Sequence, residues 1–510
     1  MLFNSYIFIL CYLPITCFVF FSLGKRSHYL AATWLTAASF LFYAWWSPDY
    51  VVLLLGSITF NYFFGRFIAR RFDEGHAKAN KIALASAVSA NLLLLIYYKY
   101  TNLLVASANE LFGTGFHIGA IVLPIGISFF TFTQIAFLVD ASKGLAKEYR
   151  FIHYCMFVTY FPHLIAGPVL HHKEMMPQFS DKKTYRLNYD NLALGMTLFT
   201  FGLAKKLLLA DNLSIYATPV FDAAAAGTKI GFLEAWGGSL SYALQIYFDF
   251  SGYTDMAIGL SQMFGVKLPI NFYSPYKALN IIDFWRRWHI TLSRFLRDYL
   301  YIPLGGNRKG KARRYLNLFM TMLLGGIWHG ANWTFLAWGG LHGIYLIVNH
   351  AWQGLLTRLG WTQTGHGAYR LFCGAITFLS VVVAWVFFRA ESIPAATKIV
   401  SGMLGKNGLG IPVKWLDERS GAINWLLDHG AYPSTNTLFA AGAESRMIAL
   451  SLAICWLLPN TVDIFSGSAM GKARWWSWTT NKAWTMATVI LGFFSFLSIS
   501  GLSEFIYFQF

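Results

Sequence analysis

The sequence predicts an all-α membrane protein that crosses the bilayer many times. Of its 510 residues, 56% are apolar and only 12% are charged. A soluble domain carries about 25% charged residues, so this chain cannot cover a water-facing surface of its size. The 18% share of aromatic residues likewise excludes a disordered chain. A conventional soluble enzyme is therefore excluded.

The excess of basic residues points to the same class. Lys and Arg number 40 against 23 Asp and Glu, a net charge of +17. They stand in short clusters between apolar stretches, as in multi-span membrane proteins, and not on one hydrophilic face as in nucleic-acid binders. We therefore expect contact with membrane lipid and no nucleic-acid partner. The alternation of basic and neutral loops before residue 150 places the N-terminus outside the cytoplasm.

Eight uncharged runs approach the roughly 20 residues that a helix needs to cross a bilayer. They are residues 6–23, 29–46, 51–65, 82–98, 117–139, 371–388, 447–462 and 483–503. No basic residue precedes the first run, which we interpret as a retained span and not as a cleaved signal peptide.

Further apolar stretches are less regular. No charged residue occurs between Arg314 and Arg358, which leaves room for two helices with a turn near residues 330–333. Residues 151–170, 191–204 and 235–266 are short or interrupted by Pro, Gly or Asp, which predicts kinked, re-entrant or cavity-lining segments. We expect a single membrane domain over residues 1–510, with about 11 to 13 transmembrane helices around a central passage.

Metal binding and disulfides are not expected. The five cysteines are scattered without a CxxC pair. His163, His171 and His172 lie close in sequence but lack the helical spacing with a carboxylate that zinc sites use.

Residues 283–300, DFWRRWHITLSRFLRDYL, separate into two faces on a helical wheel. One face holds Trp285, Trp288, His289, Leu292, Phe295, Leu296 and Tyr299, and the other holds Arg286, Arg287, Arg294, Arg297 and Asp298. This pattern predicts one helix lying in the membrane interface, with His289 on its buried side. Two roles for His289 stay open: a packed histidine with local partners, or one facing a substrate passage.

A cationic loop follows at residues 301–315. Its basic residues are Arg308, Lys309, Lys311, Arg313 and Arg314, with three glycines among them. The loop serves either as an anchor on anionic lipid or as a docking surface for the phosphates of a cytoplasmic donor such as coenzyme A. The same charges would suit both roles.

His329, in LLGGIWHGANWTF, is the strongest candidate for chemistry. Polar groups at membrane depth are costly and mark functional sites, and an imidazole away from water stays uncharged, as a general base requires. Asn332 or a backbone N–H could stabilise an oxyanion. The alternative for His329 is a structural hydrogen bond between helices. For His342, in WGGLHG, the structural role is favoured.

Asp249 and Asp255, in YFDFSGYTD, complete the set of polar candidates. On a helix they lie about 120° apart, so they do not form a facing acid and base pair. One of the two could orient a histidine. The alternative is that these carboxylates pair with an arginine or cap a broken helix.

The longer motifs resemble the membrane-bound O-acyltransferase family, in the bacterial branch typified by alginate O-acetyltransferase. FWRRWHITLSRFLRDYLYIPLGG and LGGIWHGANWTF carry the resemblance, together with LPIGISFFTFTQIAFLVD (123–140), YFPHLIAGPVL (160–170) and YFDFSGYTDMAIGL (247–260). It covers at least residues 1–350. The C-terminal third is similar only in being hydrophobic.

This resemblance implies a transmembrane enzyme with a tunnel joining the two sides of the bacterial inner membrane. It implies that His329 is catalytic, that His289 is the family's second histidine, and that residues 280–350 form the catalytic segment. It further implies acetyl transfer from a cytoplasmic donor, acetyl-CoA, to an extracytoplasmic exopolysaccharide of the alginate or cellulose type. Candidate substrate contacts are Asn332, Trp328, Trp285, Arg308, Lys309 and Asp249. No bound cofactor is expected.

Several alternatives stay open. The acetyl group could pass to the polysaccharide directly or through a periplasmic partner protein. No GxSxG motif is present, so a hydrolase-type serine nucleophile is not expected. A transporter or flippase would also use intramembrane histidines, although such proteins commonly show paired repeats and none is visible here. A scaffold for polysaccharide export is the third possibility.

Overall fold

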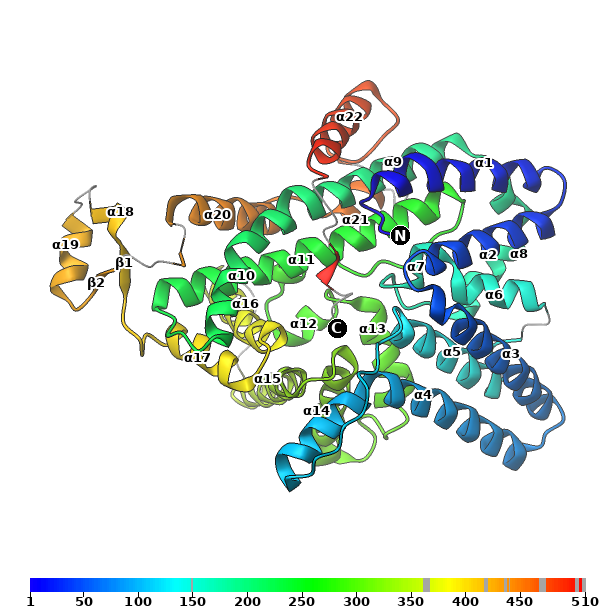
Figure 1. Ribbon diagram of the computed structural model, residues 1–510, viewed down its shortest axis with the longest axis horizontal. Coiled ribbons are helices and arrows are strands. Elements are labelled where there is room, and N and C mark those ends of the chain that lie inside the picture. Colours follow the sequence, from blue (N-terminus) through cyan, green and yellow to red (C-terminus); the bar gives the residue numbers. More distant parts are fainter. Residues whose placement is uncertain are drawn as a thin grey trace. The chain divides into compact units, whose positions relative to one another are not determined.

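The computed structural model describes residues 1–147, 150–360, 367–416, 421–434, 438–439, 441–466, 474–499 and 504–506. Within these residues the secondary structure is almost entirely helical, which confirms the all-α class (Figure 1). The chain divides into two compact units. A single membrane domain with a central tunnel stays a prediction.

Unit 1 comprises Met1–Ala204, Ser251–Asn271 and Thr461–Phe510. Besides residues 251–263 of α11 (Phe232–Met263), its elements are η1 (Phe8–Tyr12), α1 (Leu13–Gly24), α2 (His28–Ala44), η2 (Pro48–Tyr50), α3 (Val51–Asp73), α4 (Ala77–Phe112), α5 (Ile127–Ser142), α6 (Phe151–Thr159), α7 (Phe161–Leu164), α8 (His172–Ser180), η3 (Lys182–Tyr185), α9 (Tyr189–Ala204), α21 (Thr461–Ser466) and α22 (Lys482–Leu497).

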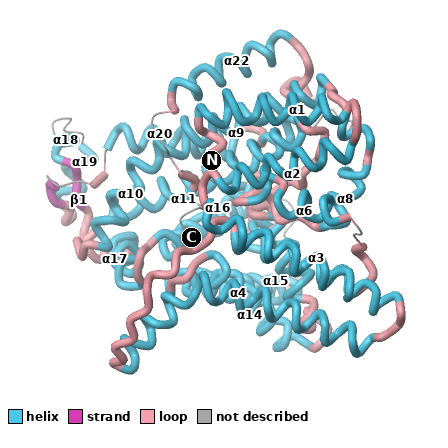
Figure 2. The backbone as a smooth tube through the Cα atoms, turned by 45° about the vertical axis from the view of Figure 1, so that its right-hand side comes forward, coloured by secondary structure: helices cyan, strands magenta, loops and turns pink. Residues whose placement is uncertain are grey.

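Unit 2 comprises Lys205–Phe250 and Phe272–Asn460. Besides residues 232–250 of α11, its elements are η4 (Lys205–Ala210), α10 (Asp211–Ala225), η5 (Pro275–Lys277), α12 (Ile281–Trp285), α13 (Ile290–Leu296), η6 (Arg297–Tyr301), α14 (Gly310–His329), α15 (Trp333–Arg358), α16 (Gly367–Arg389), α17 (Ile393–Met403), β1 (Gly410–Pro412), α18 (Val413–Leu416), α19 (Gly421–Asp428), β2 (Tyr432–Ser434) and α20 (Ala441–Leu457). Figure 2 shows the two short parallel strands in magenta.

Four helical segments among the described residues are long and apolar enough to cross a membrane. They are Pro48–Asp73, Ala77–Phe112, Tyr189–Ala225 and Gly367–Arg389. Shorter apolar helices cover Phe8–Gly24, Ile127–Ser142 and Lys482–Leu497. Large apolar side chains such as Phe18 and Leu371 are exposed, as lipid contact requires. The chain is therefore a multi-pass membrane protein, while the predicted helix count and orientation stay predictions.

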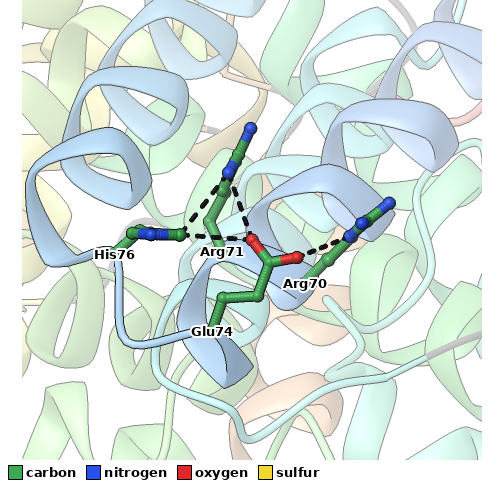
Figure 3. Close-up of polar contacts among 4 residues, drawn as sticks. All are labelled: Arg70, Arg71, Glu74 and His76. Atoms are coloured by element: carbon green, nitrogen blue, oxygen red, sulfur yellow. Dashed lines mark hydrogen bonds and ion pairs between the residues drawn. The ribbon is translucent and has the colours of Figure 1, made fainter.

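The basic turn between α3 and α4 is tied by one carboxylate (Figure 3). Glu74 accepts from Arg70 Nε at 2.7 Å and from Arg71 at 3.1 Å, and lies 3.2 Å from His76 Nδ1. The hydrogen bond from the Arg70 guanidinium lowers the pKa of Glu74. The alternation of basic and neutral loops predicts that this basic turn lies on the cytoplasmic side.

The predicted pair of helices with a turn near residues 330–333 is confirmed by α14 and α15, which pack against each other (Figure 1). The helices approach each other closely at two glycines, Gly326 and Gly339. A Cβ on Gly339 would lie 2.5 Å from the Met322 carbonyl oxygen and 3.2 Å from the Cα of Gly326. Only glycine permits this approach, which is the small-residue packing common in membrane helices.

Two predicted spans have the wrong length. The run 117–139 is helical only from Ile127, because Pro124 and a left-handed Gly126 (φ 73°) delay the helix start. The run 447–462 overlaps α20, which ends at Leu457, just before Pro459. For the run 483–503, α22 ends at Leu497, and residues 500–503 lie outside the described residues.

The stretches predicted as interrupted behave in different ways. Residues 151–170 are broken as predicted, because α6 and α7 are separated at Tyr160 (ψ 105°). Residues 235–266 were expected to be kinked, re-entrant or cavity-lining. The expected interruption is wrong, because these residues lie largely in the continuous helix α11, while a cavity-lining role stays a prediction. Its Gly259 does not interrupt the helix but lets α9 approach, since a Cβ there would lie 2.6 Å from the carbonyl oxygen of Gly195.

Replacing Gly339 by alanine is expected to destabilise the protein by about 1 to 3 kcal/mol, because the added methyl group overpacks the contact between α14 and α15. The neighbouring Gly340 is the matched control, since a Cβ there would meet only Leu323 Cδ1 at 3.9 Å. Thermal unfolding of the purified protein in detergent measures both variants. Equal unfolding temperatures for Gly339→Ala and Gly340→Ala would contradict the close contact.

Candidate functional site

The segment predicted as one interfacial helix, residues 283–300, is broken at His289, so the single helix is wrong. Helix α12 ends at Trp285, and α13 starts at Ile290. His289 precedes α13 in a left-handed conformation, φ 43° and ψ 55°. Ser274 is the one other non-glycine residue with positive φ in the described ranges. The segment contains no glycine or proline, so its sequence carries no signal for this break.

The break marks a candidate functional site, because a left-handed backbone is costly for a residue with a side chain. Such residues cost about 1 to 3 kcal/mol, persist only where surrounding contacts hold them, and cluster at functional sites. His289 is 0% exposed, which confirms the predicted burial. Its ring lies 4.8 Å from that of Phe250 and nearly perpendicular to it.

His329 is the last residue of α14 and is 5% exposed. Aromatic rings surround its imidazole: Trp328 at 5.0 Å, Trp338 at 5.0 Å and Phe388 at 5.3 Å between ring centroids. The ring of His289 lies 6.4 Å away. The structure therefore brings together the two histidines that the sequence selected.

Trp328 contacts both of these histidines. Its ring centroid lies 6.5 Å from that of His289 and 5.0 Å from that of His329. The side chain is buried. It is thus placed beside both imidazoles, and its predicted contact with substrate stays a prediction.

A third histidine joins the group through Trp285. The indole Nε1 of Trp285 donates a hydrogen bond to His342 Nδ1 at 3.3 Å. His342 is fully buried. Trp338 connects the group, because its ring lies 4.8 Å from His342 and 5.0 Å from His329.

A cavity of about 460 Å³ lies beside this aromatic group in unit 2. Residues from 282–301 form one side of it, and residues from α14 and α15 form the other. Its polar lining includes Trp285, Arg286, Ser293, Arg294, Arg297 and Thr321. The other walls are largely apolar, so the cavity combines guanidinium groups with surfaces suited to an aliphatic chain. Trp285 belongs both to this cavity and to the histidine group.

Asp249 takes part in a buried ion pair. Its carboxylate lies 2.6 Å from Lys206 Nζ, and both side chains are 2% exposed. Lys206 also pairs with Asp211 at 2.9 Å. The pairing alternative for Asp249 is thus what the structure shows, with lysine in place of arginine. Contact of Asp249 with substrate stays a prediction that this geometry does not favour.

Asn332 holds the turn between α14 and α15. Its side-chain oxygen accepts from Thr334 N at 3.1 Å, and its Nδ2 donates to the Glu391 carbonyl at 2.8 Å. The carboxamide therefore caps α15 and fastens the turn to the segment after α16. A role in stabilising an oxyanion stays a prediction.

The remaining candidates lie elsewhere. Arg308 and Lys309 are exposed in the turn before α14, and their contact with a donor stays a prediction. His163 Nε2 lies 2.9 Å from the Phe157 carbonyl oxygen. Among the residues that the structure describes, no group of three or more His, Cys, Asp or Glu side chains is placed to hold a metal ion.

Comparison with known proteins agrees with the motifs. The model of the membrane-bound O-acyltransferase family matches residues 40–389, a range that includes both histidines and the cavity. The chain belongs to the membrane-bound O-acyltransferase family. It is therefore an enzyme that transfers acyl groups.

Relatives of this O-acyltransferase act on different acceptors by name. It is 40% identical to a peptidoglycan O-acetyltransferase of Helicobacter pylori, over 100% of this chain and 98% of that protein. It is 42% identical to the probable alginate O-acetylase AlgI of Pseudomonas putida, over 79% and 80% of the two chains. A teichoic acid D-alanyltransferase of Streptococcus thermophilus is 29% identical over 45% of this chain and 57% of its own length.

Sequence reasoning missed three parts of the site. The sequence places Arg286, Arg294 and Arg297 on one helical face, but only the fold shows that they share one cavity. The sequence contains 19 tryptophans, and no pattern distinguishes Trp338 from the others. Lys206 did carry a signal in the sequence, because a lysine inside the apolar stretch GLAKKLLLA needs a carboxylate partner.

Replacing Asp249 by alanine is expected to destabilise the O-acyltransferase by about 3 to 5 kcal/mol, because it removes one partner of a buried ion pair. The control is Asp298→Ala, which removes a surface ion pair with Arg297. The Arg297 side chain is 61% exposed and that of Asp298 is 32% exposed, so this loss should cost at most about 1 kcal/mol. Unfolding temperatures in detergent compare the two. Similar values for both variants would contradict the energetic importance of the buried pair.

Proposed function

We propose that this O-acyltransferase moves an acetyl group from acetyl-CoA in the cytoplasm to hydroxyl groups of an extracytoplasmic glycan, with His329 as the general base. The observation that supports this role is the buried His329 imidazole, enclosed by aromatic rings and 6.4 Å from the ring of His289. Two buried histidines at this ring separation can each act on a different group of the same reaction. The relatives named for peptidoglycan and alginate acetylation support acetyl transfer.

The chemistry requires one base and one group that stabilises negative charge. His329 removes the proton from an acceptor hydroxyl, and the oxygen attacks the thioester carbonyl carbon. The tetrahedral intermediate then expels the coenzyme A thiolate, which takes the proton from the His329 imidazolium. His289 is the candidate to hydrogen-bond the oxyanion during this step. The same steps hold when the first acceptor is a hydroxyl of a partner protein.

The cavity lined by Arg286, Arg294 and Arg297 is the candidate donor site. Guanidinium groups bind phosphate oxygens in pairs of parallel hydrogen bonds. The apolar walls suit the aliphatic arm that carries a thioester. The exposed Arg308 and Lys309 would then attract the donor from solution at longer range.

Peptidoglycan is the first acceptor to test, because the relative that matches the whole chain is named for it. Alginate is the second, and cellulose stays a weaker possibility. With a donor from the cytoplasm and an acceptor outside it, the proposal puts the enzyme in the bacterial inner membrane. The transporter and scaffold alternatives do not explain membership of an acyltransferase family.

Replacing His329 by alanine is expected to lower acetyl transfer at least about 100-fold, because a general base contributes roughly 10² to 10⁴. Transfer of labelled acetyl from acetyl-CoA to peptidoglycan or alginate in isolated membranes measures the rate. His350→Ala is the matched control, since His350 lies on α15 beside Tyr315, with ring centroids 6.5 Å apart. Full activity of His329→Ala would exclude this residue as the base.

Replacing Arg294 by glutamine is expected to raise the KM for acetyl-CoA about tenfold, because a hydrogen bond to a charged group contributes about 1.5 to 3 kcal/mol. The double variant Arg308→Gln/Lys309→Gln should raise KM less, and this effect should shrink at high salt. Arg358→Gln, at the end of α15, is the control. An unchanged KM in Arg294→Gln would remove the cavity from the donor site.

A further inference from the structure

The hydrogen bond from Trp285 to His342 places a fixed side chain on the wall of the arginine-lined cavity. Trp285 Nε1 donates to His342 Nδ1 at 3.3 Å, from α12 to the middle of α15. Because Nδ1 accepts this bond, the ring hydrogen of His342 is on Nε2 and the imidazole is neutral. The bond therefore requires one particular tautomer.

The imidazole of His342 is held on several sides by aromatic rings. Trp338 lies 4.8 Å away, Tyr345 lies 5.7 Å away, and Phe284 stacks nearly parallel at 6.1 Å. The side chain is fully buried. Since these neighbours restrict the rotation of the ring, the acceptor nitrogen keeps a fixed position.

Trp285 connects the cavity to the histidine group. It lines the cavity, and its ring lies 5.8 Å from that of Trp338. Trp338 in turn lies 5.0 Å from His329. Trp285 is thus the cavity-lining residue that is linked, through Trp338, to the His329 imidazole.

We propose that His342 is a positioning residue, which holds the Trp285 indole in the cavity lining and so fixes the shape of the acyl-donor site at this residue. This inference rests on the proposed function in one respect, the binding of the donor in this cavity. Without its acceptor, the indole would leave this orientation and the cavity would fit the donor less well. The loss should affect donor binding more than the chemical step.

The test uses variants that separate the two ring nitrogens of His342. His342→Asn keeps an acceptor near the position of Nδ1, whereas His342→Gln places its amide near the position of Nε2. Trp285→Phe removes the indole N–H. We expect Trp285→Phe and His342→Gln each to raise the KM for acetyl-CoA about fivefold, which is the range for one lost hydrogen bond, with kcat changed less than about twofold. His342→Asn should restore most of the affinity.

The double variant Trp285→Phe/His342→Gln decides whether the residues act as a pair. We expect its KM to equal that of the more affected single variant, because the same bond is already lost. A KM equal to the product of the two single effects would overturn the proposal, as would a His342→Asn variant as impaired as His342→Gln.

A second measurement separates this inference from the proposed function. If the unmodified enzyme does not use acetyl-CoA, the donor proposal fails, but the same variants can still be compared by their unfolding temperatures. The bond predicts that the decreases in unfolding temperature are also non-additive. Additive decreases in that case would overturn the pairing of Trp285 with His342.

Discussion

The exclusion of water from polar side chains is the constraint on which the rest of this structure depends. In lipid and in a packed helical interior, each buried charge or imidazole must find its partners within the chain. Lys206 meets Asp249, and His342 meets Trp285. His329 is enclosed by tryptophan and phenylalanine rings. The aromatic content of the chain is therefore part of how its polar groups are held in place.

The sequence predicts well those features that a short segment determines alone. Gly330 and Asn332 mark the turn between α14 and α15, and the absence of charge around His329 marks it as a polar group in apolar surroundings. The motifs also predict the family. For the turn and for His329, the sequence signal lies within about one helical turn of the structural feature that it predicts.

Features that depend on packing could not be predicted from one sequence. The break at His289 arises in a segment with regular helical periodicity, so only contacts with other segments can hold it. The glycines of α11 were taken as interruptions, but Gly259 is where α9 packs closely. Likewise, the cavity joins residues of 282–301 with α14 and α15, and no local pattern predicts that arrangement. The similarity to the Helicobacter pylori relative extends through the C-terminal third, where the motifs gave no indication.

The left-handed backbone of His289 sets stability against activity at a single residue. A glycine there would adopt φ 43° without the penalty of about 1 to 3 kcal/mol that a side chain incurs. It would also delete the imidazole from the centre of the acyltransferase. Under the proposed function, a substitution that relaxes this backbone would therefore also remove a group that the reaction uses.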